Sequence, residues 1–233
     1  LAFVNAWFAL DPKKRRDLCE SARVPLGISP VNIEKDFWVC WAMRELFGLS
    51  DWGPQLTFKG GTSLSKAWSL IDRFSEDVDV VIEREFLGFG GQTLSKKRLE
   101  KLRETCGRRI GKDLRPALHD AIKKTMPSRE AWSLDLAGPD VDPDGQTLLF
   151  SYPTLFSGES GYVRQVVKLE FGARSETEPA ESPRIGPMLS GVFPDQLGSG
   201  TFPVRTVAAR RTFWEKAMLL HEENARARPP KAR

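Results

Sequence analysis

The stretch FKGGTSLSKAWSLIDRFSEDVDVVI, residues 58–82, decides the fold. Its Gly-Gly-Thr-Ser turn interrupts an apolar run and predicts a joint between a strand and a helix. Asp77 and Asp79 stand two apart in a second apolar run. Because alternate residues of a strand share a face, both carboxylates point the same way while the intervening valines face the core.

Two neighbouring carboxylates repel each other unless a cation lies between them, so the pair favours Mg²⁺ or Mn²⁺ as cofactor. The turn supplies N–H groups and the positive end of a helix dipole for phosphate. Together these parts predict a site for a metal-bound nucleoside triphosphate (NTP). In the predicted strand 164–171, Lys168 and Glu170 share one face. Glu170 is the candidate third acid of a metal cluster formed with Asp77 and Asp79.

Each part has a simpler explanation. An Asp-x-Asp pair alone is a weak signal, and a Gly-Gly-Thr-Ser turn is an ordinary strand–helix joint. Lys66 could be a solvated helix residue, and Glu170 could form an ion pair at a sheet edge. The order of turn, helix, paired acids and a further acid favours the functional interpretation.

The remaining chain alternates helical and extended patterns. Helices are expected over 1–23, 30–48, 64–72, 94–124 and 204–226, and strands over 55–59, 77–82, 147–152 and 164–171. Thr62 or Ser63 is expected to cap the helix at 64–72. The helical segment 94–124 is expected to break near 107–111 or at Pro116. The Pro- and Gly-rich stretch 172–203 predicts an irregular connector.

Charge is concentrated in one segment. Residues 96–124 hold eleven basic and four acidic side chains, a net +7 in a chain of net +4. The segment could be a solvated helical face or a footprint for a phosphate backbone. The three scattered cysteines, with no ligand spacing, predict reduced thiols in a cytoplasmic protein. No apolar run is long enough to span a membrane, and no signal peptide is found.

The segment 58–82 resembles the signature of the AbiEii-type nucleotidyltransferase toxins of type IV toxin–antitoxin systems, within the DNA polymerase β-like superfamily. NIEKDFWV (32–39) resembles the family's N-terminal helix, and RRTFWEKAMLLH (210–221) resembles a later helix whose lysine contacts the triphosphate. Many members continue after that helix into a motif ending in an Asp-Leu pair, which is absent here.

The resemblance implies roles for individual residues. Asp77, Asp79 and Glu170 would bind the metals, and Lys216 would contact the triphosphate. These four form the implied catalytic set. The phosphate turn and the rest of the nucleotide pocket would comprise Lys59, Gly60, Gly61, Thr62, Ser63, Lys66, Arg73, Ser75 and Lys168.

The predicted fold is α+β: a nucleotidyltransferase core with a small mixed β-sheet flanked by helices, and a mostly helical C-terminal part. Three segments are expected. Residues 1–92 hold the N-terminal helices and the core motifs, 93–175 the basic helical segment and returning core strands, and 176–233 the connector and the last helix.

The predicted reaction transfers a nucleoside monophosphate from an NTP to a hydroxyl, with pyrophosphate leaving. The family implies tRNA as acceptor, at its 3′ end, with translation and growth blocked, and a separately encoded antitoxin as partner. A monomer without membrane contact is expected. A small-molecule nucleotidyltransferase of the antibiotic-modifying type and a non-catalytic nucleotide-binding module are the alternatives. The sequence leaves open the identity of the NTP and of the acceptor.

Overall fold

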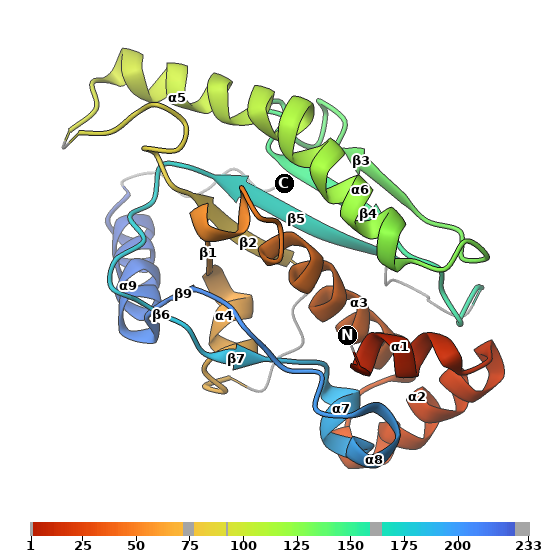
Figure 1. The fold of residues 1–233 in the computed structure, drawn as a ribbon. Coiled ribbons are helices and arrows are strands. Elements are labelled where there is room, and N and C mark those ends of the chain that lie inside the picture. The colour runs from red at the N-terminus through yellow and green to blue at the C-terminus, as the bar shows by residue number, and fades with distance from the viewer. Residues whose placement is uncertain (1, 72–76, 92, 159–164, 227–233) are drawn as a thin grey trace.

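The computed structural model describes residues 2–71, 77–91, 93–158 and 165–226. Its centre is a seven-stranded mixed sheet with the strand order β3-β4-β5-β2-β1-β9-β6 (Figure 1). The strands are β1 (Leu56–Lys59), β2 (Asp77–Ile82), β3 (Ser133–Leu136), β4 (Thr147–Ser151), β5 (Val166–Gly172), β6 (Ala180–Glu181) and β9 (Thr206–Val207). Half of the structure is helical. This confirms the predicted α+β class.

The sheet combines strands from all three predicted segments. Strand β2 pairs with β1 in antiparallel fashion and with β5 in parallel fashion, and β1 pairs in parallel with β9. The central strands therefore come from distant parts of the chain.

Helix α3 (Pro30–Phe47) lies in the middle of the core (Figure 1). Ser29 caps it by accepting a hydrogen bond from the Asn32 N–H, and Pro30 occupies its first turn, where no N–H is required. Phe37 stacks on Trp7 of α1 (Ala2–Ala9) with ring centroids 4.3 Å apart. Buried aromatic rings on several sides of α3 explain why its apolar surface exceeds one stripe.

The sheet has two chemically different faces. Val78 and Val80 of β2 join the core cluster together with Leu102 and Leu118 from the basic helical segment. Helices α3, α5 (Lys96–Arg109) and α6 (Arg115–Thr125) cover this apolar face (Figure 1). The opposite face carries the polar residues of β1, β2 and β5, because side chains alternate along each strand.

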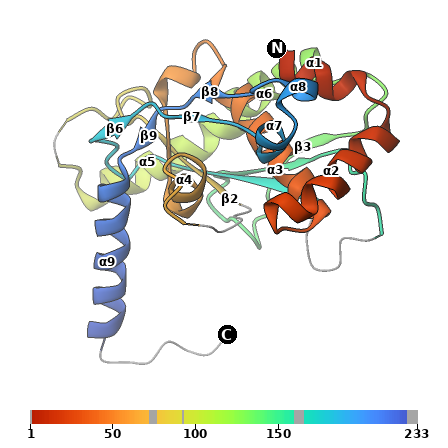
Figure 2. The same ribbon diagram turned by 90° about the horizontal axis from the view of Figure 1, so that it is seen from below.

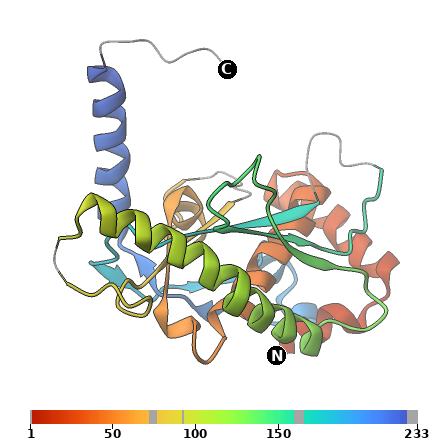
Figure 3. The same ribbon diagram turned by 90° about the horizontal axis from the view of Figure 1, so that it is seen from above.

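Helix α9 (Ala209–Ala225) projects from the body of the protein, on the other side of the sheet from α5 (Figures 2 and 3). Among its described residues only Thr212 is buried, and several large apolar side chains are exposed: Phe213, Trp214, Met218, Leu219 and Leu220. The expected helix 204–226 starts later than predicted, because Thr206–Val207 pairs with β1 and β6 as strand β9.

Other boundaries also differ from expectation. The basic helices are joined by a π-helical turn, Ile110–Leu114, rather than by a break. Pro116 is tolerated because it lies in the first turn of α6, directly after this wide turn. Strand β3 was missed, since its four residues alternate only briefly.

The connector 172–203 is more ordered than predicted. It holds short elements that bury Ile185, Leu189 and Leu197. Proline and glycine limit the length of these elements without preventing them. They are β6, β7 (Arg184–Ile185), α7 (Met188–Val192), α8 (Pro194–Leu197) and β8 (Phe202–Pro203). The remaining helices are α2 (Pro12–Leu26), α4 (Gly60–Lys66) and the 3₁₀ turn Gly53–Gln55. No helix in the described ranges has both the length and the apolar content to cross a membrane.

Candidate functional site

Strands β1, β2 and β5 bring the predicted acids and lysines together. Asp79 of β2 lies opposite Glu170 of β5 and opposite Lys59 of β1. Asp77 lies opposite Lys168 in the same parallel pairing. Because directly paired residues point to the same face of a sheet, all five side chains belong to the polar face. Sequence alternation placed the two aspartates correctly, and the parallel register adds Glu170 beside them.

The turn before α4 packs directly against this acidic cluster. Gly60 has a left-handed backbone with φ of 78°, and a β-carbon there would collide with the carboxylate of Asp79. Only glycine permits this close approach of backbone and carboxylate. A β-carbon placed on Gly61 would lie 3.9 Å from the Lys216 ammonium of α9. The turn therefore stands between Asp79 on one side and a lysine on the other.

The helix begins earlier than predicted, at Gly60, and neither Thr62 nor Ser63 is its N-terminal cap. The Ser63 hydroxyl donates to the Gly60 carbonyl at 2.8 Å, and the Thr62 hydroxyl donates to the Asp77 carbonyl. Both side chains are buried. They fasten the turn to itself and to β2, so what the turn presents outward is backbone.

Charges around Asp79 are strongly coupled. Burial, followed by the nearby Glu170 carboxylate, raises the pKa of Asp79 to about 6, and Asp77 adds to this. Lys59 and Lys216 act in the opposite direction. Lys168 forms an ion pair with Glu170, and the hydrogen bond that its ammonium donates to this carboxylate raises the pKa of the lysine. A cation bound beside Asp79 would relieve the repulsion from the neighbouring carboxylates that contributes to this raised pKa.

The donor set fits a hard divalent cation. Within the described ranges, no three acidic, histidine or cysteine side chains converge closely enough to hold a metal by themselves. Mg²⁺ characteristically takes one or two protein carboxylates and completes its shell with substrate phosphate oxygens and water. The two aspartates on one strand face satisfy that requirement, with Glu170 adjacent to them.

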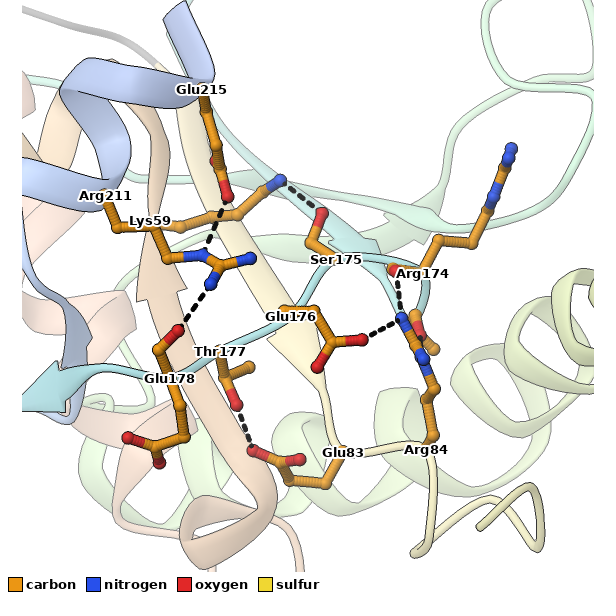
Figure 4. A network of polar contacts seen from close by, with 11 residues as sticks. Lys59, Glu83, Arg84, Arg174, Ser175, Glu176, Thr177, Glu178, Arg211 and Glu215 are labelled. Atoms are coloured by element: carbon orange, nitrogen blue, oxygen red, sulfur yellow. Dashed lines mark hydrogen bonds and ion pairs between the residues drawn. The ribbon is translucent and has the colours of Figure 1, made fainter. Parts of the chain in front are cut away.

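Beside the acids, an open groove of about 660 Å³ runs between the end of β1, the segment after β5 and one side of α9. The Lys59 ammonium donates to the Ser175 hydroxyl at 2.8 Å and joins the groove to the acidic cluster. Within α9, which forms one wall of the groove, Arg211 donates through Nε to Glu215 at 3.1 Å (Figure 4). The indole of Trp214 is 64% exposed there. The groove therefore combines cationic, aromatic and hydrogen-bonding groups.

The segment that carries Ser175 is held firmly in place (Figure 4). Arg84 donates to the Ala173 carbonyl at 3.0 Å and forms an ion pair with Glu176 at 3.0 Å. The Thr177 hydroxyl donates to Glu83 at 3.0 Å. Sequence reasoning missed this segment and the groove. The only available signal was the RRTFWEK stretch, from which Lys216 alone was selected although Trp214 and two arginines stand beside it.

Three predicted pocket residues have different outcomes. Lys66 has a different partner: its ammonium is buried in an ion pair with Asp36 of α3, which does not support its predicted place in the nucleotide pocket. The reason is that α4 is short, and residue 66 lies at the end far from the turn. Arg73 and Ser75 lie outside the described residues.

A mixed sheet with paired carboxylates beside a glycine turn suits transfer of a phosphate-bearing group, which depends on positioning and charge neutralisation. Residues 41–233 match the family model described as "Nucleotidyl transferase AbiEii toxin, Type IV TA system". The chain belongs to this family of nucleotidyltransferase toxins, and the resemblance of residues 58–82 is confirmed.

Among solved structures, the chain is similar to MenT4, a nucleotidyltransferase toxin from Mycobacterium tuberculosis. The identity is 21% and the TM-score 0.45, over 87% of this chain. The chain spans 57% of the length of that protein. A comparison with curated protein sequences gives no match.

The substitution Asp79→Asn tests the electrostatics of the acidic cluster. Because the pKa of Asp79 is raised to about 6 in the folded protein, its ionised form costs stability above that pH. In metal-free buffer near neutral pH, the variant should be more stable by on the order of 1 kcal/mol. The gain should shrink as the pH falls through about 6 and disappear below about 4, where both folded and unfolded carboxyls are protonated. Thermal unfolding across this pH range measures the effect, and identical curves at every pH would contradict it.

Proposed function

We propose that this chain is a metal-dependent toxin that transfers a nucleoside monophosphate from an NTP to the 3′ end of tRNA. The observation that carries the proposal is the convergence of Asp79 and Lys216 on one glycine turn, with Asp77 on the same face of β2 as Asp79. In this class of reaction the protein contributes positioning and charge neutralisation rather than covalent chemistry. The family's type IV toxin–antitoxin assignment implies an antitoxin as a further partner.

The residues of the site have separate roles in binding the metal, the phosphates and the nucleoside. Asp77 and Asp79 would hold the metal, which supplies charge neutralisation and orientation of the phosphates when bound. Lys216 and the backbone of the turn at Gly61 neutralise the β- and γ-phosphates. The nucleoside lies in the groove, where Trp214 offers a stacking surface and Lys59 a cation between base and phosphates.

The bond changes follow in one step. The 3′ hydroxyl oxygen of the acceptor forms a bond to the α-phosphorus while the bond from that phosphorus to the bridging oxygen breaks. Pyrophosphate leaves with the electron pair. Glu170, directly opposite Asp79 in the sheet, orients the hydroxyl and accepts its proton. Lys168 keeps that carboxylate in place until the acceptor arrives.

The direct experiment is transfer itself. The purified protein is incubated with Mg²⁺, total tRNA and each labelled NTP in turn, and label is sought in the RNA. Asp77→Ala and Asp79→Ala should abolish transfer without loss of fold, because each removes a metal ligand and relieves repulsion. Near wild-type turnover in either variant would exclude the proposed metal site. Label entering a small hydroxyl compound but never RNA would favour the antibiotic-type alternative.

Lys216→Ala should lower kcat/KM for the NTP about 100-fold, because an ammonium facing the developing phosphate charge is lost. The matched control is Lys123→Ala, an exposed lysine on α6 on the apolar side of the sheet. Steady-state kinetics with varied NTP measures both variants. Equal kinetics for the two variants would show that Lys216 is merely a solvated helix residue.

The N-terminal part of the basic helical segment lies close to the segment that follows β5. A shallow pocket of about 190 Å³ is lined by Lys96 and Arg103 of α5 together with Arg174, which adjoins Ser175 of the groove. Arg109 does not belong to an RNA surface, because it pairs with Asp113 and packs on Trp52. The N-terminal half of α5 is therefore the best candidate for RNA contact.

Replacing Lys96, Lys97 and Lys101 together by alanine should weaken tRNA binding and flatten its salt dependence. Each lost phosphate contact should reduce the slope by about 0.7 or less, while NTP binding stays unchanged. A variant lacking Lys112, Lys123 and Lys124 removes the same charge from the distal part of the segment. Binding measured across a salt series should separate the two, and superimposable curves would contradict an RNA footprint on α5.

A further inference from the structure

Helix α3 buries three consecutive charged side chains, Glu34, Lys35 and Asp36, each no more than 1% exposed. Burying a charge is costly unless the group is paired and hydrogen-bonded. Glu34 accepts from the Leu155 N–H at 2.7 Å and from the Thr154 hydroxyl at 2.9 Å, which ties α3 to the loop after β4. Asp36 has different partners, and these lead towards the site.

One carboxylate oxygen of Asp36 pairs with the Lys66 ammonium of α4, and the other accepts from the Met188 N–H at 2.8 Å, at the start of α7. The Lys66 side chain is only 9% exposed. Burial alone would lower the pKa of Lys66, but Asp36 and then Cys40 raise it above its ordinary value. The ammonium therefore stays charged and remains paired with Asp36 of α3.

The pair fixes one end of a very short helix. Helix α4 has seven residues, so about 10 Å separate its two ends. Its first residue, Gly60, packs against the Asp79 carboxylate, and Gly61 faces Lys216. Two turns of helix transmit a displacement of the last residue to the first, because a packed helix moves as a unit. Just after α4, the Trp68 indole donates to the Val207 carbonyl of β9 at 3.2 Å.

We propose that the buried Asp36–Lys66 pair is a positioning device that holds the glycine turn against Asp79, and that Lys66 never touches the nucleotide. The consequence for catalysis rests on the proposed nucleotidyl transfer. The placement of the turn does not depend on it.

The first measurement needs no activity. Amide hydrogen exchange of the peptide 60–67 is followed in Asp36→Asn and Lys66→Met, with Glu34→Gln as matched control. The control removes an equally buried carboxylate two residues away on the same helix. Exchange at 60–67 should accelerate in the first two variants and stay at the wild-type rate in the control. Equal protection of 60–67 in all variants would overturn the proposal.

The second measurement uses NTP kinetics. A misplaced turn should lower kcat/KM about 100-fold in both single variants, because small displacements of a positioning group are costly. The neutral double variant Asp36→Asn/Lys66→Met should be no worse than either single one, because the two residues act as a unit. If a single variant fails to fold, the double variant still allows the test, because it leaves no unpaired buried charge.

The outcomes separate the explanations. If Lys66→Met is defective while Asp36→Asn is not, Lys66 binds phosphate directly and the proposal is wrong. If Glu34→Gln loses kcat/KM as strongly as Asp36→Asn, the pair contributes only general stability, which also overturns it. If the wild type transfers no nucleotide at all, the proposed function fails. Hydrogen exchange then still decides whether the pair positions the turn.

Discussion

The close approach of the Gly60 backbone to the Asp79 carboxylate is the contact on which the site depends. It exists because residue 60 has no side chain and adopts a positive φ, and because the antiparallel pairing of β1 with β2 sets Asp79 opposite Lys59, the residue before Gly60. Every other proposed group is placed relative to this contact. Glu170 and Lys59 flank Asp79 in register, and Lys216 reaches the adjacent Gly61 from a helix far away in sequence.

The two faces of the sheet have different roles: one is packed into the apolar core, and the other carries the charged residues of the candidate site. The apolar face is packed with valines, leucines and aromatic rings from α3 and the basic helices, and this packing supplies most of the folding free energy. The opposite face holds several carboxylates together with lysines. Burial and repulsion between the carboxylates raise the pKa of Asp79, and the lysines lower it. Clusters of this kind with shifted pKa values are found more often at functional sites, where a substrate or cation balances the charge. The groove along α9 extends this face outward and supplies the aromatic surface that the sheet lacks.

Much of the fold could be predicted because the signals were local. Alternation fixed the face of Asp77 and Asp79, and the helix expected over 30–48 matches α3. Alternation along 164–171 also pointed to Glu170 as a candidate, whereas Lys216 came from the family resemblance alone. What failed depended on distant contacts. Lys66 is only seven residues from Lys59, yet its side chain points towards Asp36 on another helix, with which it forms an ion pair. The short strand β9 was read as helix because its pairing partner lies almost 150 residues earlier in the chain. The groove could not be foreseen, since Ser175 and Trp214 meet only after folding.

We propose above that the acidic face around Asp77 and Asp79 binds a metal–NTP complex. The most direct test is a crystal structure with Mn²⁺ and a non-hydrolysable NTP, with the metal located by its anomalous scattering. We expect a metal peak bonded to both aspartates, phosphates against the turn at Gly61 and near Lys216, and the base beside Trp214. A metal and nucleotide bound elsewhere, with the aspartates uncoordinated, would show that this face is not the nucleotide site.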